Sequence, residues 1–300
     1  MKGYLLAVCS GVFWGFLGFY GSKLNSYGFT GNEVAFLRMF FGFLCGMIYL
    51  VSSKENRKNL KISRSSIKYI MLIGVVTQGL LNLFSYSAIL ELGTVTATML
   101  LCTGPIFTVI LSSIFLKENF TLEKQVSLAI TILGSVLLIS EGNFSGMNFS
   151  IMGILLGAAS GLCYGIYPII GKQSKGSNPV FITVLGFLVA ALFLIPFISM
   201  GDMVRKIANI EIFLTIISFG IIPTLLAYLI FLKAMEYIPA SVASILTLIE
   251  VPTTALIGVL VLNEHFNSYK FVGLLIVLIG ISITKINLKT LFIFRKAKTA

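Results

Sequence analysis

The 300-residue chain has few charged side chains, because only 11% of its residues are Asp, Glu, Lys or Arg whereas 57% are hydrophobic. Soluble domains carry about 25% charged residues, so this chain has too little charge to cover a water-facing surface. The scarcity of charge excludes a soluble enzyme, and the abundance of apolar residues excludes a disordered chain. Ten membrane-spanning helices of about 20 residues would account for about 300 residues. The composition therefore predicts a polytopic membrane protein.

Histidine and cysteine are also scarce. The one histidine, His265, excludes a metal site built from several histidines. The four cysteines lie inside apolar stretches, without the spacing of metal ligands or the loop positions of a disulfide, and we interpret them as small buried side chains; they are Cys9, Cys45, Cys102 and Cys163. The motifs HExxH and GxSxG and a phosphate-binding loop are missing, so neither a catalytic function nor a cofactor is expected.

Continuous apolar runs separated by polar breaks predict an all-α integral membrane protein with ten transmembrane helices. A β-barrel is excluded because its strands would alternate and would be far shorter. The first run is interpreted as a mature span rather than a signal peptide, because it is longer than a typical signal core and Val8 stands where a cleavage site needs a smaller residue. The predicted spans are about 4–22, 33–51, 67–89, 94–116, 123–140, 151–171, 179–199, 211–233, 240–262 and 270–286.

The basic residues indicate the orientation of these spans. Of the 22 Lys and Arg residues, 17 fall on the side of the N-terminus, 4 on the other side, and Arg38 within a span. Cytoplasmic loops collect Lys and Arg, so the bias predicts a plasma (inner) membrane protein with both termini in the cytoplasm. Arg57 and Lys296 are expected inside, and Asn143 and Asn267 outside. The net charge of +11 is therefore interpreted as topogenic, and no nucleic-acid partner is expected.

The chain repeats itself in register. An offset of 150 relates the first and sixth predicted spans, and an offset of 146 relates later positions; matched pairs include Gly3/Gly153, Ser10/Ser160, Gly11/Gly161, Gly15/Gly165, Ala97/Ala243, Glu118/Glu264, Phe120/Phe266 and Lys124/Lys270. This predicts two five-helix repeats, 1–145 and 146–290, followed by a basic cytoplasmic tail, 291–300. Because five is odd, the repeats must cross the membrane in opposite senses. Inverted repeats of this kind are typical of alternating-access transporters.

Glycines and prolines predict where the helices pack closely or bend. Glycine or alanine recurs every four residues along the first and sixth spans, giving faces on which neighbouring backbones can approach closely, either as static packing or as rocking surfaces. Two prolines lie near the centres of the fourth and ninth spans, where broken helices point to a transporter's central site. The predicted hinge and packing residues are Gly11, Gly15, Pro105, Gly161, Gly165 and Pro252.

Two charged residues lie inside predicted spans. Glu250 is at the middle of the ninth span, where an ionised side chain is costly unless it is paired, solvated or protonated. Arg38 lies in the second span, about 6 Å to the outer side of its midpoint. Arg38 can reach a substrate carboxylate, pair with Glu250, or extend to the outer interface. A structural ion pair is the alternative to a functional role for both residues.

Aromatic and amide side chains complete a candidate solute site. Trp14 and Tyr164 occupy equivalent repeat positions, and Tyr228 is the equivalent of Asn82. Buried amides must find partners, so they face protein or water rather than lipid, although any one aromatic ring is more often a packing residue. The predicted substrate-binding residues are Trp14, Arg38, Gln78, Asn82, Tyr164, Tyr167, Tyr228 and Glu250.

The pattern resembles the EamA-type family of the drug/metabolite transporter superfamily over about residues 3–286. The resemblance is carried by SGVFWG in the first span mirrored by SGLCYG in the sixth, by Arg38, by Pro105 followed by LKENF, and by Glu250 followed by NEHF. One departure is that the family has a proline directly after the glutamate of the ninth span, whereas Val251 here precedes Pro252.

The resemblance implies a secondary transporter that moves small metabolites, amino acids or related compounds, by alternating access, with export favoured. Its expected partners are a small-molecule substrate, the lipid bilayer and protons, in a monomer or a homodimer. Coupling to protonation of Glu250 and direct contact of Glu250 with a substrate amine both stay open. A membrane-embedded enzyme or a scaffold without transport activity is the alternative class.

Overall fold

The computed structural model describes residues 1–52, 64–144, 150–174, 178–262 and 265–285, and every regular element in these ranges is helical. The elements of the first half are α1 (Lys2–Gly15), α2 (Leu17–Ser26), α3 (Gly31–Ser52), α5 (Arg64–Met71), η1 (Leu72–Leu80), α6 (Leu81–Leu92), α7 (Thr94–Leu101), α8 (Gly104–Phe115) and α9 (Leu122–Ser140). Those of the second half are α10 (Ile151–Gln173), α11 (Pro179–Leu194), η2 (Ile195–Phe197), α12 (Met200–Ile207), α13 (Ile210–Phe219), η3 (Gly220–Leu226), α14 (Ala227–Met235), α15 (Ala240–Thr247), α16 (Glu250–Leu262) and α17 (Ser268–Ile283).

Nine helical segments among the described residues are long and apolar enough to cross a membrane, and they follow the first nine predicted spans to within a few residues. The tenth predicted span, 270–286, corresponds to α17, an apolar helix of 16 residues. A count of ten therefore stays a prediction. Arg57, Lys296, Glu264 and the predicted tail 291–300 lie outside the described residues.

The outer surface of the bundle is apolar. Large side chains such as Leu5, Ile48, Leu133 and Leu260 are each about two-thirds exposed or more. A soluble protein rarely presents such contiguous apolar area to water, whereas the hydrocarbon core of a bilayer solvates it. The exposed apolar surface thus agrees with a membrane protein.

The helices begin where side chains can satisfy their first amides. Asn178 precedes Pro179 and accepts hydrogen bonds from two amides of α11, Asn209 does the same for α13, and Asn267 caps α17. Thr30 and Glu33 form a reciprocal capping box at the start of α3. Each of these caps satisfies donors that would otherwise be unpaired at the helix end.

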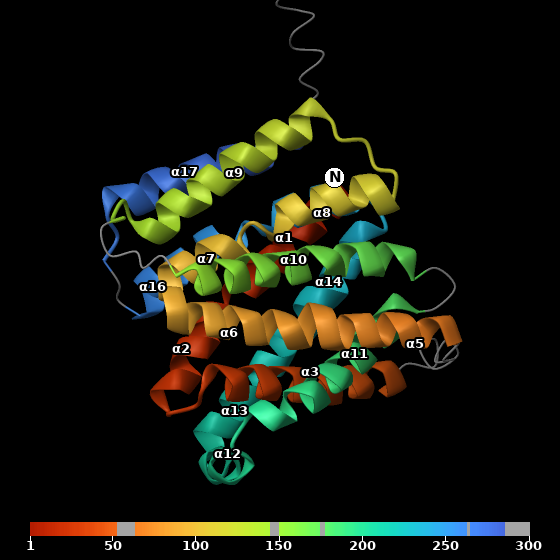
Figure 1. Cartoon of the computed structure of the whole chain (residues 1–300), viewed down its shortest axis with the longest axis vertical. Coiled ribbons are helices and arrows are strands. Elements are labelled where there is room, and N and C mark those ends of the chain that lie inside the picture. The colour runs from red at the N-terminus through yellow and green to blue at the C-terminus, as the bar shows by residue number, and fades with distance from the viewer. Residues whose placement is uncertain (53–63, 145–149, 175–177, 263–264, 286–300) are drawn as a thin grey trace, which may run out of the picture.

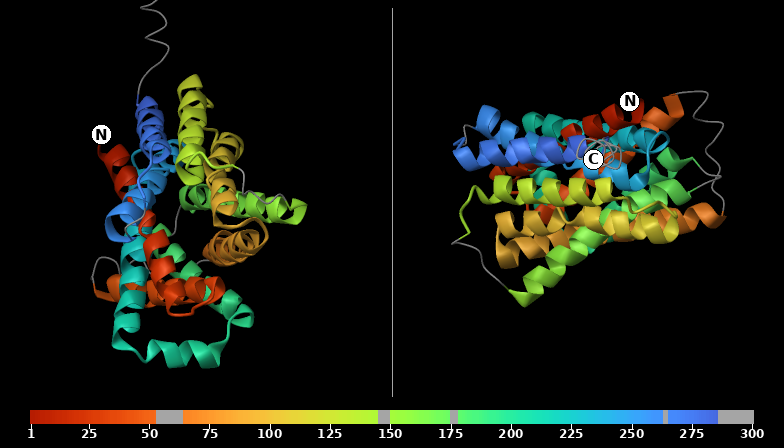
Figure 2. Two further views of the ribbon diagram at one scale, coloured as in Figure 1. Left: turned by 90° about the vertical axis from the view of Figure 1, so that its left-hand side faces the viewer. Right: turned by 90° about the horizontal axis from the view of Figure 1, so that it is seen from above.

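The helices lie side by side across the bundle (Figure 1). α9 and α17 pack against each other at one end, and α12 and α13 lie at the other end, an arrangement that is also visible in the left view of Figure 2. Between them, α1 packs on α14, α15 and α16, whereas α10 packs on α6, α7 and α8. Each glycine-rich helix therefore packs on three neighbouring helices along one face, while side chains such as Leu5 of α1 and Leu155 of α10 stay exposed on another.

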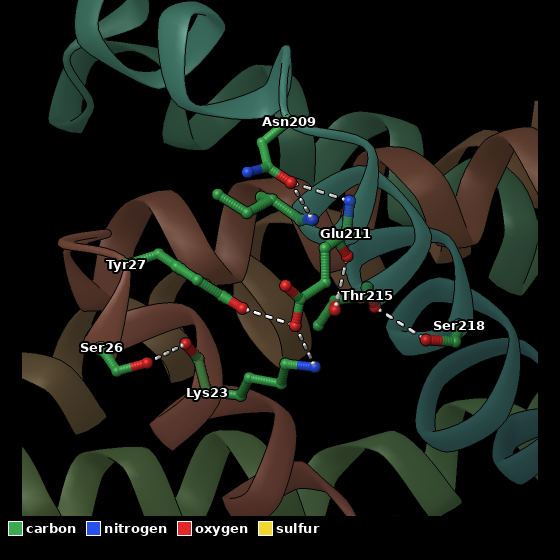
Figure 3. A network of polar contacts seen from close by, with 8 residues as sticks. Lys23, Ser26, Tyr27, Asn209, Glu211, Thr215 and Ser218 are labelled. Carbon is green, nitrogen blue, oxygen red and sulfur yellow. Dashed lines mark hydrogen bonds and ion pairs between the residues drawn. The ribbon is translucent and has the colours of Figure 1, made fainter.

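The bundle has two faces where connections meet. We call the face that carries Met1 and Lys285 the terminal face; there Lys285 Nζ lies 3.0 Å from Met1 Sδ, and Lys2 lies over the Tyr237 ring. The opposite face carries the connection between α2 and α3 and the elements from η2 to the start of α13. Figure 3 shows the polar network there, in which Glu211 accepts a 2.7 Å hydrogen bond from the Tyr27 hydroxyl and pairs with Lys23 at 3.1 Å. These contacts join α2 to α13 at an exposed site, where water screens the ion pair and keeps its contribution to stability small.

Two membrane spans are interrupted at matching positions of the sequence repeat. α7 ends at Leu101 and α8 begins at Gly104, whereas α15 ends at Thr247 and α16 begins at Glu250. Broken or bent helices were expected at the two prolines, and both spans are broken there, with Pro105 second in α8 and Pro252 third in α16. A proline is tolerated in a first helical turn because the amide it lacks has no partner within the helix. The one-residue displacement of Pro252 therefore leaves the position of the break unchanged.

The predicted glycine faces cover these breaks. A methyl group added at Gly165 of α10 would lie 2.6 Å from the Gly104 carbonyl oxygen, and one added at Gly161 would lie 2.9 Å from the Leu100 carbonyl oxygen. Gly11 and Gly15 of α1 meet the second break, where added methyl groups would lie 2.7 Å from the Thr247 oxygen and 3.1 Å from the Glu250 oxygen. Only hydrogen fits at these sites, so glycine is what lets α1 and α10 lie directly on the backbone of a broken span.

Replacement of Gly165 by alanine should lower the free energy of unfolding by about 1–3 kcal/mol, because the obstructing Gly104 oxygen belongs to the backbone. The matched control is Gly21→Ala in α2, where an added methyl group meets nothing within 4 Å. The control should be neutral or slightly stabilising, because alanine has the higher helix propensity. Unfolding by SDS in mixed micelles measures both, and equal stability of the two variants would show that the close approach is not required.

Candidate functional site

Trp14, the one tryptophan of the chain, lies at the centre of a buried aromatic cluster. Its ring centroid lies 6.3 Å from that of Tyr164, 5.2 Å from that of Tyr228 and 5.1 Å from that of Phe231. The first two contacts are edge-to-face, the arrangement that the quadrupoles of aromatic rings favour. The cluster joins α1 to α10 and α14 and so connects the two halves of the sequence.

A buried polar contact extends the cluster toward η1. Gln78 donates a 2.7 Å hydrogen bond from Nε2 to the Tyr228 hydroxyl, and Asn82 donates from Nδ2 to the Gln78 carbonyl oxygen at 2.6 Å. Gln78 is buried, whereas Asn82 is half-buried. The contact brings together the third and eighth spans.

Both of these spans contain a π-helical segment that the sequence did not predict. η1 ends at Leu80 and η3 ends at Leu226, positions related by the same repeat offset of 146 as the helix breaks. π-helical turns are rare and occur often at functional sites, because the wider turn redirects the side chains that follow. Here they lie directly beside Gln78, Asn82 and Tyr228.

Arg38 is buried in α3, with 9% of its surface exposed. Its guanidinium lies beside the Tyr228 hydroxyl and within electrostatic range of the Glu250 carboxylate. No ion pair among the residues that the structure describes joins Arg38 to Glu250, so the direct pairing that the sequence allowed is not formed. Within the described ranges, neither Arg38 Nε nor Gln78 Oε1 has a hydrogen-bond partner. A buried donor and a buried acceptor in the same region are thus unpaired among these residues.

Glu250 is the first residue of α16, directly after the second helix break, and its side chain is half-buried. The backbone amides that follow Glu250 are not free, because Val251 N bonds to the Leu248 oxygen, Thr253 N bonds to the Ile249 oxygen and Pro252 has no amide hydrogen. The opposite charge that acts on the Glu250 carboxyl is that of Arg38.

The structure brings together Trp14, Gln78, Tyr164, Tyr167 and Tyr228 through direct contacts or hydrogen bonds, with Arg38 and Glu250 beside them. The Tyr167 ring lies 4.9 Å from that of Tyr228, and its hydroxyl lies 3.2 Å from Thr183 Oγ1. Since Tyr167 is buried and its hydroxyl is satisfied, its contacts here are packing contacts. Asn82, Tyr164 and Glu250 are the half-buried members of the set.

Two further aromatic residues, Phe187 and Phe231, were missed from the sequence. Phe231 follows Tyr228 by one helical turn, so their shared helix face was a signal that could have found it. Phe187, whose ring lies 5.2 Å from that of Tyr228, belongs to the uniformly apolar α11, where no periodicity marks one face. Among the described residues, no cluster of three or more His, Cys, Asp or Glu side chains could hold a metal ion.

These observations define a helical membrane protein with a polar and aromatic cluster at paired helix breaks in its interior. The EamA-like transporter family matches residues 1–140 and 151–286, and the chain belongs to this family. This confirms the resemblance drawn from the sequence motifs.

The similar proteins of known name are transporters. An uncharacterized transporter of Archaeoglobus fulgidus is 28% identical over 94% of this chain and 98% of its own length. The uncharacterized transporter YdfC of Bacillus subtilis is 28% identical over 80% of this chain and 76% of its own. A protein of known crystal structure superposes with a TM-score of 0.78 over 94% of this chain and 95% of its own, at 14% identity, which shows the fold alone.

The hydrogen bond between Gln78 and Tyr228 should be visible as an energetic coupling. Tyr228→Phe leaves the Gln78 amide without its acceptor, so we expect the double variant Gln78→Leu/Tyr228→Phe to lose less stability than the sum of the single variants. The expected coupling is about 1 kcal/mol. The matched control is the cycle Gln78→Leu with Tyr167→Phe, because the Tyr167 hydroxyl contacts Thr183 instead. Additive losses in the first cycle would contradict the observed contact.

Proposed function

We propose that the protein is a secondary transporter that moves small metabolites across the plasma membrane by alternating access between two inverted five-helix halves. The observation that carries this proposal is the convergence of Arg38, Gln78, Tyr228 and Glu250 at a helix break inside the bundle, where Arg38 Nε and Gln78 Oε1 find no hydrogen-bond partner among the described residues. Unpaired polar groups in a membrane interior are costly and mark substrate or ion pathways. The family and its named relatives support transport as the activity.

The substrate class follows from the chemistry of the cluster. A guanidinium is suited to a carboxylate, a carboxylate to an ammonium group, and aromatic rings to an apolar or cationic side chain. Arg38, Glu250 and Trp14 together offer these three kinds of contact. We therefore propose amino acids or related zwitterions as substrates, with export as the favoured direction and both termini in the cytoplasm.

The two helix breaks and the glycine faces supply the mechanical part of the proposal. Discontinuous helices at equivalent repeat positions are typical of transporter sites, because their free backbone ends stabilise charged groups near the midplane. In this proposal, Gly11 and Gly15 of α1 and Gly161 and Gly165 of α10 are the smooth surfaces on which the broken helices move. A bound zwitterion would pair with the charges of Arg38 and Glu250 when the site is closed to water.

Glu250→Gln should reduce the accumulation of solute against its gradient in proteoliposomes about tenfold or more. The reason is that the neutral amide provides neither a titrating proton nor a charge for a substrate amine. Retained exchange of labelled amino acid would identify Glu250 as a proton-coupling group, and lost exchange would identify it as an amine ligand. The control is Glu236→Gln, an exposed glutamate that pairs with Lys233. If Glu250→Gln concentrates solute as well as the parent protein does, Glu250 has a structural role only. Chemical turnover of a solute without its movement across the membrane would favour an enzyme over a transporter.

A further inference from the structure

Glu118, in the connection after α8, reaches across the terminal face to the start of α15. Its Oε1 accepts a 2.7 Å hydrogen bond from the Ala240 amide, and its Oε2 accepts a 3.1 Å bond from the Ser241 amide. Oε2 also accepts from the Ser241 hydroxyl. One carboxylate from the first half thus satisfies three donors at the first turn of a helix of the second half.

The charges around this contact favour the ionised carboxylate. Lys124, buried in the first turn of α9, pairs with Glu118 at 3.6 Å. A cation at a helix N-terminus is unfavourable unless a carboxylate offsets it, so Glu118 compensates Lys124 and the amides of α15 together. Burial acts to raise the pKa of Glu118, but the bonds from Ser241 and Ala240 and the charge of Lys124 outweigh it and lower the pKa.

Deeper in the bundle than the Glu118 contact, the two broken spans also contact each other through α8 and α15. The Ser244 hydroxyl lies 3.1 Å from Thr108 Oγ1, and Val109 packs with Ile245. Toward the opposite face the same spans separate, since α7 packs on α6, α9 and α10 whereas α16 packs on α1, α2, α9 and α17. In the sequence repeat, Thr94 and Val95 correspond to Ala240 and Ser241. Both are exposed, and no side-chain hydrogen bond to their amides is found within the described part of the chain.

We propose that Glu118 is the latch of the terminal face: its carboxylate holds α15 against the end of α8, and it must release Ala240 and Ser241 before that face can open. This inference rests on the proposed function for its role in transport. The contact itself lies apart from Arg38, Tyr228 and Glu250 and uses none of the residues assigned to the solute. The structure then corresponds to the form that is closed at the terminal face.

The latch can be tested by cysteine labelling without any solute. In a variant that lacks the four native cysteines, Ile245→Cys reports opening, because Ile245 is fully buried beneath the latch. Glu118→Gln should speed maleimide labelling about tenfold or more, as expected for the loss of a charge-assisted contact. Ser241→Ala, which removes one of the three donors, should give a smaller increase. Glu236→Gln, a glutamate on the same face, should leave the rate unchanged.

A second reporter separates opening from loss of the fold. Ile216→Cys in α13 is equally buried but lies outside the contact between α8 and α15. Its labelling should stay slow in Glu118→Gln. Labelling of Ile245→Cys at the parent rate in both Glu118→Gln and Ser241→Ala overturns the latch, and so does equal acceleration at Ile216→Cys.

Cross-linking tests whether release of the latch is required for transport. A short bifunctional thiol reagent that joins Glu118→Cys to Ser241→Cys should stop solute exchange in proteoliposomes, and cleavage of the cross-link should restore it. Exchange that continues in the cross-linked protein overturns the latch. A parent protein that exchanges none of the amino acids tested instead contradicts the proposed function, and the labelling rates then decide the latch alone.

Discussion

A helix that breaks inside a bilayer has amide and carbonyl groups that no water can satisfy, and this constraint governs the whole bundle. At both breaks the amides bond to carbonyl oxygens three residues back, as Thr103 does to Leu100 and Ile249 does to Leu246. Glycines of α1 and α10 lie against these same turns, with Gly161 and Gly165 on the first break and Gly11 and Gly15 on the second. This contact fixes the depth and rotation of α1 and α10. Trp14 and Tyr164 directly precede Gly15 and Gly165, so the same contact also fixes where the two rings meet.

The two helix breaks lie at matching positions of the sequence repeat but differ in charge. Gly104 and Glu250 occupy the same repeat position at the start of the second helical piece, so one break carries a glycine and the other a carboxylate. Arg38 comes from the first half and Glu250 from the second, and no direct ion pair within the described part of the chain neutralises either. Separated opposite charges in a region of low dielectric constant attract a complementary solute strongly, because little water competes. Under the proposed function, this separation is what a zwitterion would bridge.

Much of this arrangement could be predicted from the sequence, because length, glycine spacing and isolated charges are strong signals in membrane helices. The first nine spans, the close packing at Gly11 and Gly165, and the proximity of Trp14 to Tyr164 follow from such signals. The π-helical segments could not be predicted, because they depend on how apolar neighbours pack rather than on any one residue. Broken or bent helices could be expected at Pro105 and Pro252, and the structure adds that each proline lies in the first turn after its break, where the missing amide is harmless. Phe187 was missed because α11 is apolar all round.

Trp14 offers the most direct measurement of the central claim, that the cluster at the helix breaks is where a solute binds. As the one tryptophan of the chain, it lies 5.2 Å from Tyr228 and 6.3 Å from Tyr164, so its emission reports on this cluster alone. Titration of the purified protein with an amino acid that it exchanges in proteoliposomes should change the emission saturably, with the same half-saturation as exchange. A solute that is exchanged while Trp14 emission stays constant at every concentration would contradict the account.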